Sequence, residues 1–163
     1  MRRVFLTGAS SGIGLAIAKL LVEEGHEVWG TSRNLERIPK IPRFHAIRLD
    51  LADRLSIESA FNSALAEAGY FDVLINNAGA GHFGPAELLP FETITSQFQV
   101  LVFGQIQLMQ LALRHMQANG WKIRLERRVK AAIARRGIAA GTWLDSSPFG
   151  PRAADHKTET GSY

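Results

Sequence analysis

The sequence predicts an α/β fold in which a parallel sheet is covered by helices on both faces. Short apolar runs alternate with helical patterns up to residue 118, and the segments between the runs are long enough to hold crossover helices. Composition agrees, because 163 residues with 46% hydrophobic content can bury the core of one domain.

Four strands are predicted from apolar runs that are bounded by polar or glycine-containing turns. They cover residues 2–7, 27–31, 44–49 and 73–75. Pro39 and Pro42 interrupt the loop between the second and third runs. Runs as continuous as these are typical of a sheet that is buried on both faces.

Three helices are predicted from apolar residues at helical spacing. The first follows a glycine-rich turn and ends at Gly25, the second covers residues 55–68, and the third, long and apolar, covers about 93–115. The side chains predicted to face inward are Ile13, Ile17, Leu20 and Leu21 in the first helix and Leu55, Phe61 and Leu65 in the second.

The glycine-rich turn, residues 7–14 with the sequence TGASSGIG, joins the first strand to the first helix. Its glycines allow a tight bend and the close approach of a pyrophosphate, which the N-terminus of the helix attracts. In an alternative interpretation, the turn needs glycine for its backbone shape alone. The candidate phosphate-binding residues are Gly8, Ser10, Ser11, Gly12, Ile13 and Gly14.

A second polar loop, Asn76-Asn77-Ala78-Gly79, follows the fourth strand, where a parallel sheet forms a ligand crevice. The motifs T-G-x-x-x-G-x-G and N-N-A-G together resemble the short-chain dehydrogenase/reductase family over residues 1 to about 118. The resemblance implies a Rossmann-like doubly wound parallel sheet and an NAD(P)-dependent oxidoreductase that transfers hydride between the coenzyme and a small-molecule alcohol or carbonyl. By the same resemblance, the residues beside the adenine are Asp50 and Leu51, and those under the nicotinamide-side ribose are Asn77, Ala78 and Gly79.

The residues that follow the second strand indicate which coenzyme is preferred. An acidic residue there would hold the 2′-hydroxyl of NAD, whereas an arginine accommodates the 2′-phosphate of NADP. The chain has Ser32-Arg33-Asn34 and no acidic residue until Glu36. NADP is therefore favoured over NAD, with Arg33 as the phosphate ligand; the alternative is that Arg33 is an ordinary solvated residue.

The catalytic residues of the family are only partly recognisable. Family members use a serine on the fifth strand, a tyrosine and a lysine spaced Y-x-x-x-K, and an asparagine on the long helix, where this chain has Leu101. Its two tyrosines, Tyr70 and Tyr163, have no lysine four positions on. Glu126 and Lys130 have that spacing, so Lys130 is the catalytic candidate, with a glutamate in place of the tyrosine. A carboxylate donates a proton poorly at neutral pH, and we expect little turnover.

Residues 121–163 differ in charge from the rest of the chain. They contain 9 Lys and Arg against 4 Asp and Glu, whereas residues 1–120 contain 10 against 11. We predict an incomplete NADP-binding Rossmann-type domain at 1–120, truncated after strand four and its following helix, and a basic helix with coil at 121–163. Nothing after residue 119 has a strand pattern, so we expect strand four to be an exposed edge that favours homo-oligomers or aggregates.

The sequence is therefore compatible with two classes of function. The first is the oxidoreductase, and the alternative is a non-catalytic nucleotide-binding or interaction fragment of a truncated or frameshifted reductase. In the alternative, Leu125, Val129 and Ile133 give the basic helix an apolar face for nucleic acid, acidic lipid or a protein partner. A short helix that covers the sheet is the favoured interpretation, so nucleic acid is not an expected partner.

Three further features limit the function. No apolar segment is long enough to span a membrane, and the histidines lack metal-ligand spacing, so neither a membrane span nor a metal site is expected. The chain has no cysteine, which suits a reducing compartment. We expect a cytoplasmic protein.

Overall fold

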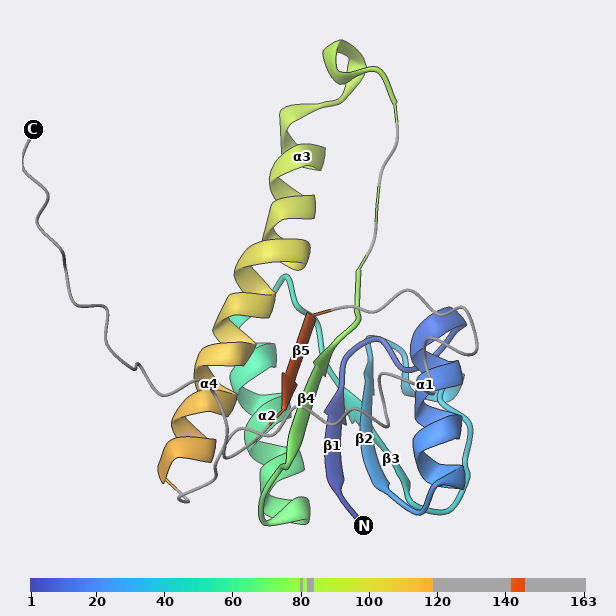
Figure 1. Ribbon diagram of the computed structural model, residues 1–163. Coiled ribbons are helices and arrows are strands. Elements are labelled where there is room, and N and C mark those ends of the chain that lie inside the picture. Colours follow the sequence, from blue (N-terminus) through green and yellow to red (C-terminus); the bar gives the residue numbers. More distant parts are fainter. Residues whose placement is uncertain (80, 82–83, 119–141, 146–163) are drawn as a thin grey trace, which may run out of the picture.

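The computed structural model describes residues 1–79, 81, 84–118 and 142–145 (Figure 1). Strands and helices alternate along the chain, as the sequence predicts. In chain order the elements are β1 (Arg3–Leu6), α1 (Gly12–Glu23), β2 (Glu27–Ser32), η1 (Leu35–Arg37), β3 (Phe44–Arg48), α2 (Arg54–Ala68), β4 (Val73–Asn76), η2 (Ala86–Leu88), α3 (Phe91–Phe98), η3 (Gln99–Phe103), α4 (Gly104–Ala118) and β5 (Thr142–Asp145).

The strands form one sheet in the order β3-β2-β1-β4-β5. β1 pairs in parallel with β2 on one side and with β4 on the other, so that Val4 lies between Val28 and Val73. β2 pairs in parallel with β3. The chain moves outward from β1 to β3 and then returns to the other side of β1. A topological switch point therefore lies between β1 and β4, at the position where such sheets bind ligands.

The edge beside β4 differs from the sequence prediction. β5 pairs antiparallel with β4, with Leu144 opposite Leu74. The expectations that no strand follows residue 119, that residues 142–145 are coil and that β4 is an exposed edge are therefore wrong. The segment has only two apolar residues, Trp143 and Leu144, between Thr142 and Asp145, and this shows neither an extended apolar run nor alternation. The unpaired backbone groups of an edge strand nevertheless offer hydrogen bonds to any segment that reaches them.

The two faces of the sheet bury two apolar clusters because neighbouring side chains on a strand point to opposite faces. Phe5 packs with Phe61 and Leu108 on the face covered by α2 and α4. Leu6 packs with Ile17 on the face covered by α1. Figure 1 shows α1 on one side of the sheet and α2 and α4 on the other. The predicted Rossmann-like doubly wound sheet is confirmed.

Two of the predicted inward-facing residues are exposed instead. α2 begins at Arg54, where the Asp53 carboxylate accepts a hydrogen bond from the backbone N–H of Leu55 at 2.9 Å. Its buried face begins at Ile57, so Leu55 points away from the core and is 72% exposed. Ile13, at the start of α1, is 42% exposed. The other predicted positions are buried or partly buried: Ile17, Leu20, Leu21, Phe61 and Leu65.

The long helix predicted at 93–115 consists of α3 and α4 joined by η3, a single π-helical turn. α4 approaches the loop that follows β3 so closely that a Cβ atom on Gly104 would overlap the carbonyl oxygen of Leu51. Glycine is required at that contact. None of the helices in the described part of the chain is long and apolar enough to cross a membrane.

Candidate functional site

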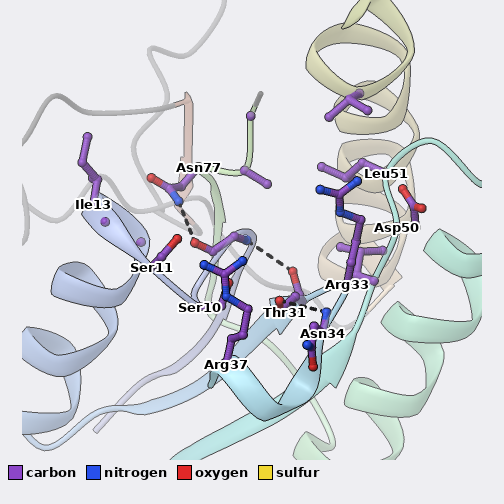
Figure 2. Close-up of a pocket in the computed structure, with 18 residues that line it drawn as sticks. Ser10, Ser11, Ile13, Thr31, Arg33, Asn34, Arg37, Asp50, Leu51 and Asn77 are labelled. Atoms are coloured by element: carbon purple, nitrogen blue, oxygen red, sulfur yellow. Dashed lines mark hydrogen bonds between the residues drawn. The ribbon is translucent and has the colours of Figure 1, made fainter. Parts of the chain in front are cut away.

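A cleft of about 630 Å³ lies where the loops that follow β1, β2, β3 and β4 meet (Figure 2). The cleft is therefore at the switch point of the sheet. All twelve residues predicted to bind the coenzyme line it: Gly8, Ser10, Ser11, Gly12, Ile13, Gly14, Arg33, Asp50, Leu51, Asn77, Ala78 and Gly79. Six lining residues were not predicted: Thr31, Ser32, Asn34, Arg37, Leu49 and Val100.

The glycine-rich turn packs closely against its neighbours. Gly8 has a φ of +70°, and a Cβ atom there would lie 2.8 Å from the Cα atom of Ala78. A Cβ atom on Gly14 would overlap the carbonyl oxygen of Gly8 and lie 2.5 Å from Nδ2 of Asn77. Gly12 has a φ of +54° and no neighbouring atom within 4 Å of its Cβ position. Backbone packing thus requires glycine at two positions whether or not a ligand binds.

The N-terminus of α1 opens into the same cleft. Ser11 is the N-cap residue, but its side chain makes no capping hydrogen bond, and the first turn contains no acidic residue. The first backbone N–H groups of a helix have no partner within the helix. With the positive end of the helix dipole, they make this end of the cleft favourable for an anion.

Thr7 joins the loop after β1 to the loop after β4. Its buried hydroxyl accepts hydrogen bonds from the backbone N–H groups of Asn77 and Ala78, both at 2.9 Å. The Asn77 side chain returns the contact, because Nδ2 donates to the carbonyl oxygens of Thr7 at 3.0 Å and Gly8 at 3.2 Å. These bonds hold the two loops at a fixed spacing across the switch point.

Two arginines from the segment after β2 lie at the cleft. Asn34 shapes this segment, since its N–H donates to Ser32 Oγ at 3.1 Å and its Oδ1 accepts from the Glu36 N–H at 3.0 Å. Figure 2 shows Arg33 extending toward Asp50 and Leu51, and Arg37 extending toward Ser10. Within the described residues, no ion pair joins either arginine to a carboxylate. Both positive charges are available to an anion in the cleft.

The loop after β3 forms the opposite wall. The Asp50 carboxylate accepts from the Ala52 N–H at 2.9 Å, and the Asp50 N–H donates to Ser56 Oγ at 2.9 Å. Leu51 is buried and gives this wall an apolar surface. The loop is therefore held by one polar contact within itself and by another to the first turn of α2.

The predicted catalytic positions are only partly described. Leu101, which the sequence analysis places at the position of the family's asparagine, lies on η3 and is 43% exposed. Its Cδ2 would be 3.0 Å from a Cβ atom on Gly79, so it lies beside the cleft wall after β4. Glu126 and Lys130 lie outside the described residues. Among the described residues, no group of three His, Cys, Asp or Glu side chains is arranged to hold a metal ion.

A glycine-lined cleft at the switch point of a parallel α/β sheet defines a nucleotide-binding protein of Rossmann type. The family model for short chain dehydrogenases matches residues 2–123. The chain belongs to the short-chain dehydrogenase family, as the two motifs predict.

Relatives support this assignment over the same part of the chain. The chain is 38% identical over 114 residues to a 3-ketodihydrosphingosine reductase of Bacteroides thetaiotaomicron. This match covers 69% of this chain and 41% of the relative. The chain is 34% identical over 120 residues to an NADPH-dependent 3-dehydrocapnine reductase of Ornithobacterium rhinotracheale. This match covers 69% of this chain and 42% of the relative. The chain therefore spans about four-tenths of the length of these curated relatives.

Solved structures share the fold. A short-chain dehydrogenase from Streptomyces avermitilis matches with a TM-score of 0.69 and 35% identity, covering 73% of this chain and 46% of that one. A short chain dehydrogenase from Burkholderia cenocepacia in complex with NADP matches with a TM-score of 0.64 and 32% identity, covering 70% and 50%.

Proposed function

We propose that the cleft binds NADP(H) in preference to NAD(H). In this proposal the chain is the coenzyme-binding part of an oxidoreductase that acts on a small-molecule alcohol or carbonyl. The observation that carries the proposal is the convergence on one cleft of the glycine-rich turn, the open N-terminus of α1 and two arginines that pair with no carboxylate of the described residues. A dinucleotide phosphate needs these features: close backbone approach, N–H donors and positive charge.

Each wall of the cleft has a proposed partner in the coenzyme. The glycine-rich turn and α1 would hold the pyrophosphate, and Arg33 with Arg37 would hold the 2′-phosphate through charge-assisted hydrogen bonds. The wall of Asp50 and Leu51 suits the adenine, with a carboxylate for the exocyclic amine and apolar contact for the ring. The loop from Asn77 through Ala78 to Gly79 would lie under the nicotinamide-side ribose.

The relatives support the choice of coenzyme. The Ornithobacterium relative is named as NADPH-dependent, and the Burkholderia structure contains NADP. The charge at the cleft supports it independently, since a 2′-phosphate gains from nearby guanidinium groups that a 2′-hydroxyl does not need. NAD is therefore the weaker proposed ligand.

The bound coenzyme would supply the hydride, while proton transfer would depend on residues of the chain. Leu101 has neither a donor nor an acceptor for a proton relay. Lys130 remains the proposed catalytic residue, with Glu126 in the place of the family's tyrosine. The second candidate function, a non-catalytic nucleotide-binding fragment, is favoured specifically by Leu101, because it places an aliphatic side chain beside the wall of the cleft after β4.

A second copy of the chain is the partner we propose for the long helix. Phe98 and Phe103, one π-helical turn apart, are 53% and 55% exposed, and Ile106 continues the apolar surface. Exposed apolar surface of this kind favours association. Sedimentation of the parent and of Phe103→Ser tests this partner: dimers that dissociate in the variant support it, and a monomeric parent contradicts it.

Calorimetric titration with NADPH and NADH tests the proposed coenzyme. Tighter binding of NADPH supports the proposal, and equal affinity for the two contradicts it. Oxidation of NADPH that depends on an added ketone or aldehyde then separates the enzyme from the non-catalytic fragment. Binding without oxidation favours the fragment.

A further inference from the structure

We propose that Gln105 is a positioning residue that sets the coenzyme-binding wall after β4 by holding the carbonyl group of Ala78. This inference rests on the proposed coenzyme site. Gln105 lies in the first turn of α4, is 9% exposed and donates from Nε2 to the carbonyl oxygen of Ala78 at 2.8 Å. Ala78 lines the cleft, whereas Gln105 does not, so any effect of Gln105 on the ligand passes through Ala78.

The Ala78 backbone is held from several directions. Its N–H donates to the hydroxyl of Thr7 at 2.9 Å, and Gly8 lies directly behind its Cα atom. Both contacts come from the β1 side of the cleft. Gln105 supplies the contact from α4, so the carbonyl end of Ala78 has a fixed direction as well as a fixed position. The backbone that follows Ala78 leads directly to Gly79, which also lines the cleft.

The start of α4 also touches the opposite wall. Gly104, the neighbour of Gln105, packs against the carbonyl oxygen of Leu51. Adjacent residues of one helix thus contact the loops after β3 and after β4. A helix is stiff over two residues, so this turn sets the separation between the wall proposed for the adenine and the wall proposed for the nicotinamide-side ribose.

The chemistry of the side chain points to its donor as the essential group. Oε1 of Gln105 is buried and has no hydrogen-bond partner among the described residues. Burying an unpaired carbonyl group is unfavourable, and an apolar side chain would avoid that cost. The orientation of the amide is determined by Ala78, because a carbonyl oxygen only accepts and must face the NH₂ group. The bond to Ala78 is therefore what distinguishes glutamine from an aliphatic residue here.

Gln105→Leu tests the proposal because it removes the donor and keeps an apolar side chain in place. We expect the affinities for NADPH and NADH to fall by the same factor, roughly tenfold, the loss expected for one hydrogen bond. The preference for NADPH should not change, since Arg33 is untouched. Calorimetric titration measures both affinities, and thermal unfolding of the same samples reports stability.

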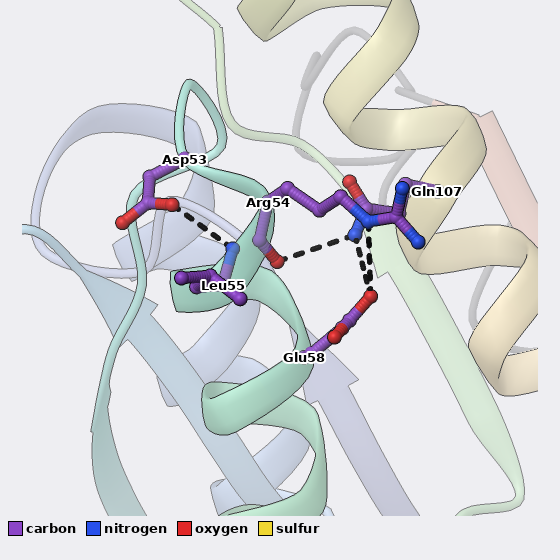
Figure 3. A network of polar contacts seen from close by, with 5 residues as sticks. All are labelled: Asp53, Arg54, Leu55, Glu58 and Gln107. Carbon is purple, nitrogen blue, oxygen red and sulfur yellow. Dashed lines mark hydrogen bonds and ion pairs between the residues drawn. The ribbon is translucent and has the colours of Figure 1, made fainter.

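Gln107→Leu is the matched control on the same helix. Gln107 Nε2 donates to the Arg54 carbonyl oxygen at 3.2 Å and to Glu58 Oε1 at 3.5 Å, and Arg54 also pairs with Glu58 at 3.2 Å (Figure 3). This variant also removes a hydrogen bond between α4 and another segment, but Gln107 does not line the cleft or contact Ala78. We expect its coenzyme affinity to equal that of the parent.

Gln105→Glu provides a test within a single protein. An ionised glutamate cannot donate and would repel the Ala78 carbonyl oxygen, whereas a protonated glutamate donates through its O–H. Burial raises the pKa of a carboxyl group toward neutrality. The affinity for NADP⁺, normalised to the parent at each pH, should therefore be weak at about pH 8 and recover toward about pH 5.5.

Each outcome bears on the inference. The inference is supported if coenzyme affinity falls in Gln105→Leu but not in Gln107→Leu, and if the affinity of Gln105→Glu recovers at low pH. Parent-like affinity in Gln105→Leu overturns it. It is also overturned if Gln105→Leu and Gln107→Leu lose affinity equally and in proportion to their loss of stability. If Gln105→Leu does not fold, a pH-independent affinity of Gln105→Glu relative to the parent overturns it. Failure of the parent to bind either coenzyme overturns the proposed function itself, and this inference with it.

Discussion

Gly14→Ala is the substitution for which the structure gives the sharpest expectation. The added methyl group would overlap the carbonyl oxygen of Gly8 and lie 2.5 Å from Nδ2 of Asn77. The first of these neighbours is backbone, and the second is held by hydrogen bonds to the carbonyl oxygens of Thr7 and Gly8. Neither group can move without disturbing the backbone or breaking these hydrogen bonds, so α1 must move away from the glycine-rich turn.

The expected magnitude follows from the size of the clash. Overpacking of a tight contact costs about 1–3 kcal/mol of unfolding free energy, which corresponds to a thermal midpoint lowered by roughly 2–12 °C for a chain of this length. Because the same shift displaces the N-terminus of α1 from the proposed pyrophosphate position, NADP(H) affinity should fall roughly tenfold or more.

Gly84→Ala is the matched control. Its Cβ position has only ordinary contacts, with the nearest atom of Leu89 at 3.6 Å. The change should therefore leave stability within about 0.5 kcal/mol of the parent and coenzyme affinity unaltered. Differential scanning fluorimetry and calorimetric titration measure the two quantities. If Gly14→Ala were as stable as Gly84→Ala and bound NADPH equally well, the packing argument for the turn would be refuted.

Three further predictions concern charge, chemistry and pH. Arg33→Asp should reduce the preference for NADPH over NADH by about 1–3 kcal/mol in calorimetric titration, and an unchanged preference would show that Arg33 does not contact the 2′-phosphate. The parent should oxidise NADPH slowly or not at all with added ketones or aldehydes; rapid turnover that Lys130→Ala abolishes would contradict this. Burial lowers the pKa of His115 below 6.5, so its protonation favours the unfolded chain, and the stability present above pH 6.5 is lost as the pH falls below it. His115→Phe should remove part of the decrease in thermal midpoint between about pH 7.5 and about pH 5.5, and an identical decrease in both proteins would contradict the role of burial.

The sequence predicts the cleft well because its main determinants are local. A glycine-rich turn after a strand, and a polar loop after another strand, are recognisable within eight residues or fewer, and the parallel sheet brings both to the same edge. Nine of the twelve predicted residues meet for that reason, whereas Arg33 follows β2, and Asp50 and Leu51, which the family resemblance indicated, follow β3. Arg37 was missed although it follows Arg33 by four residues, because the short η1 turn that directs it toward the cleft depends on the Asn34 side chain.

The missed contacts join segments that are far apart in the chain. Thr7 reaches Ala78 across the switch point, and Gln105 reaches Ala78 from α4. Neither partner can be identified without knowing the register of β1 against β4 or the rotation of the long helix. The π-helical turn before Gly104 changes that rotation, so ideal helical periodicity could not place Gln105 correctly. The exposed Leu55 shows the same limitation, since the starting residue of α2 decides which face it occupies.

The residues proposed to bind the coenzyme and the pair proposed for catalysis lie in different parts of the sequence. Every residue that lines the described cleft lies between positions 8 and 100: at the carboxyl ends of β1 to β4 and in the segments that follow them, at the start of α1 and, for Val100, on η3. The proposed binding therefore depends on residues that the structure describes. The pair proposed for proton transfer, Glu126 and Lys130, lies outside the described residues, and Leu101, which lies beside Gly79, has no proton donor or acceptor. A protein with this arrangement can hold NADP(H) firmly and still turn over slowly, so coenzyme affinity and catalytic rate must be measured separately to assign its function.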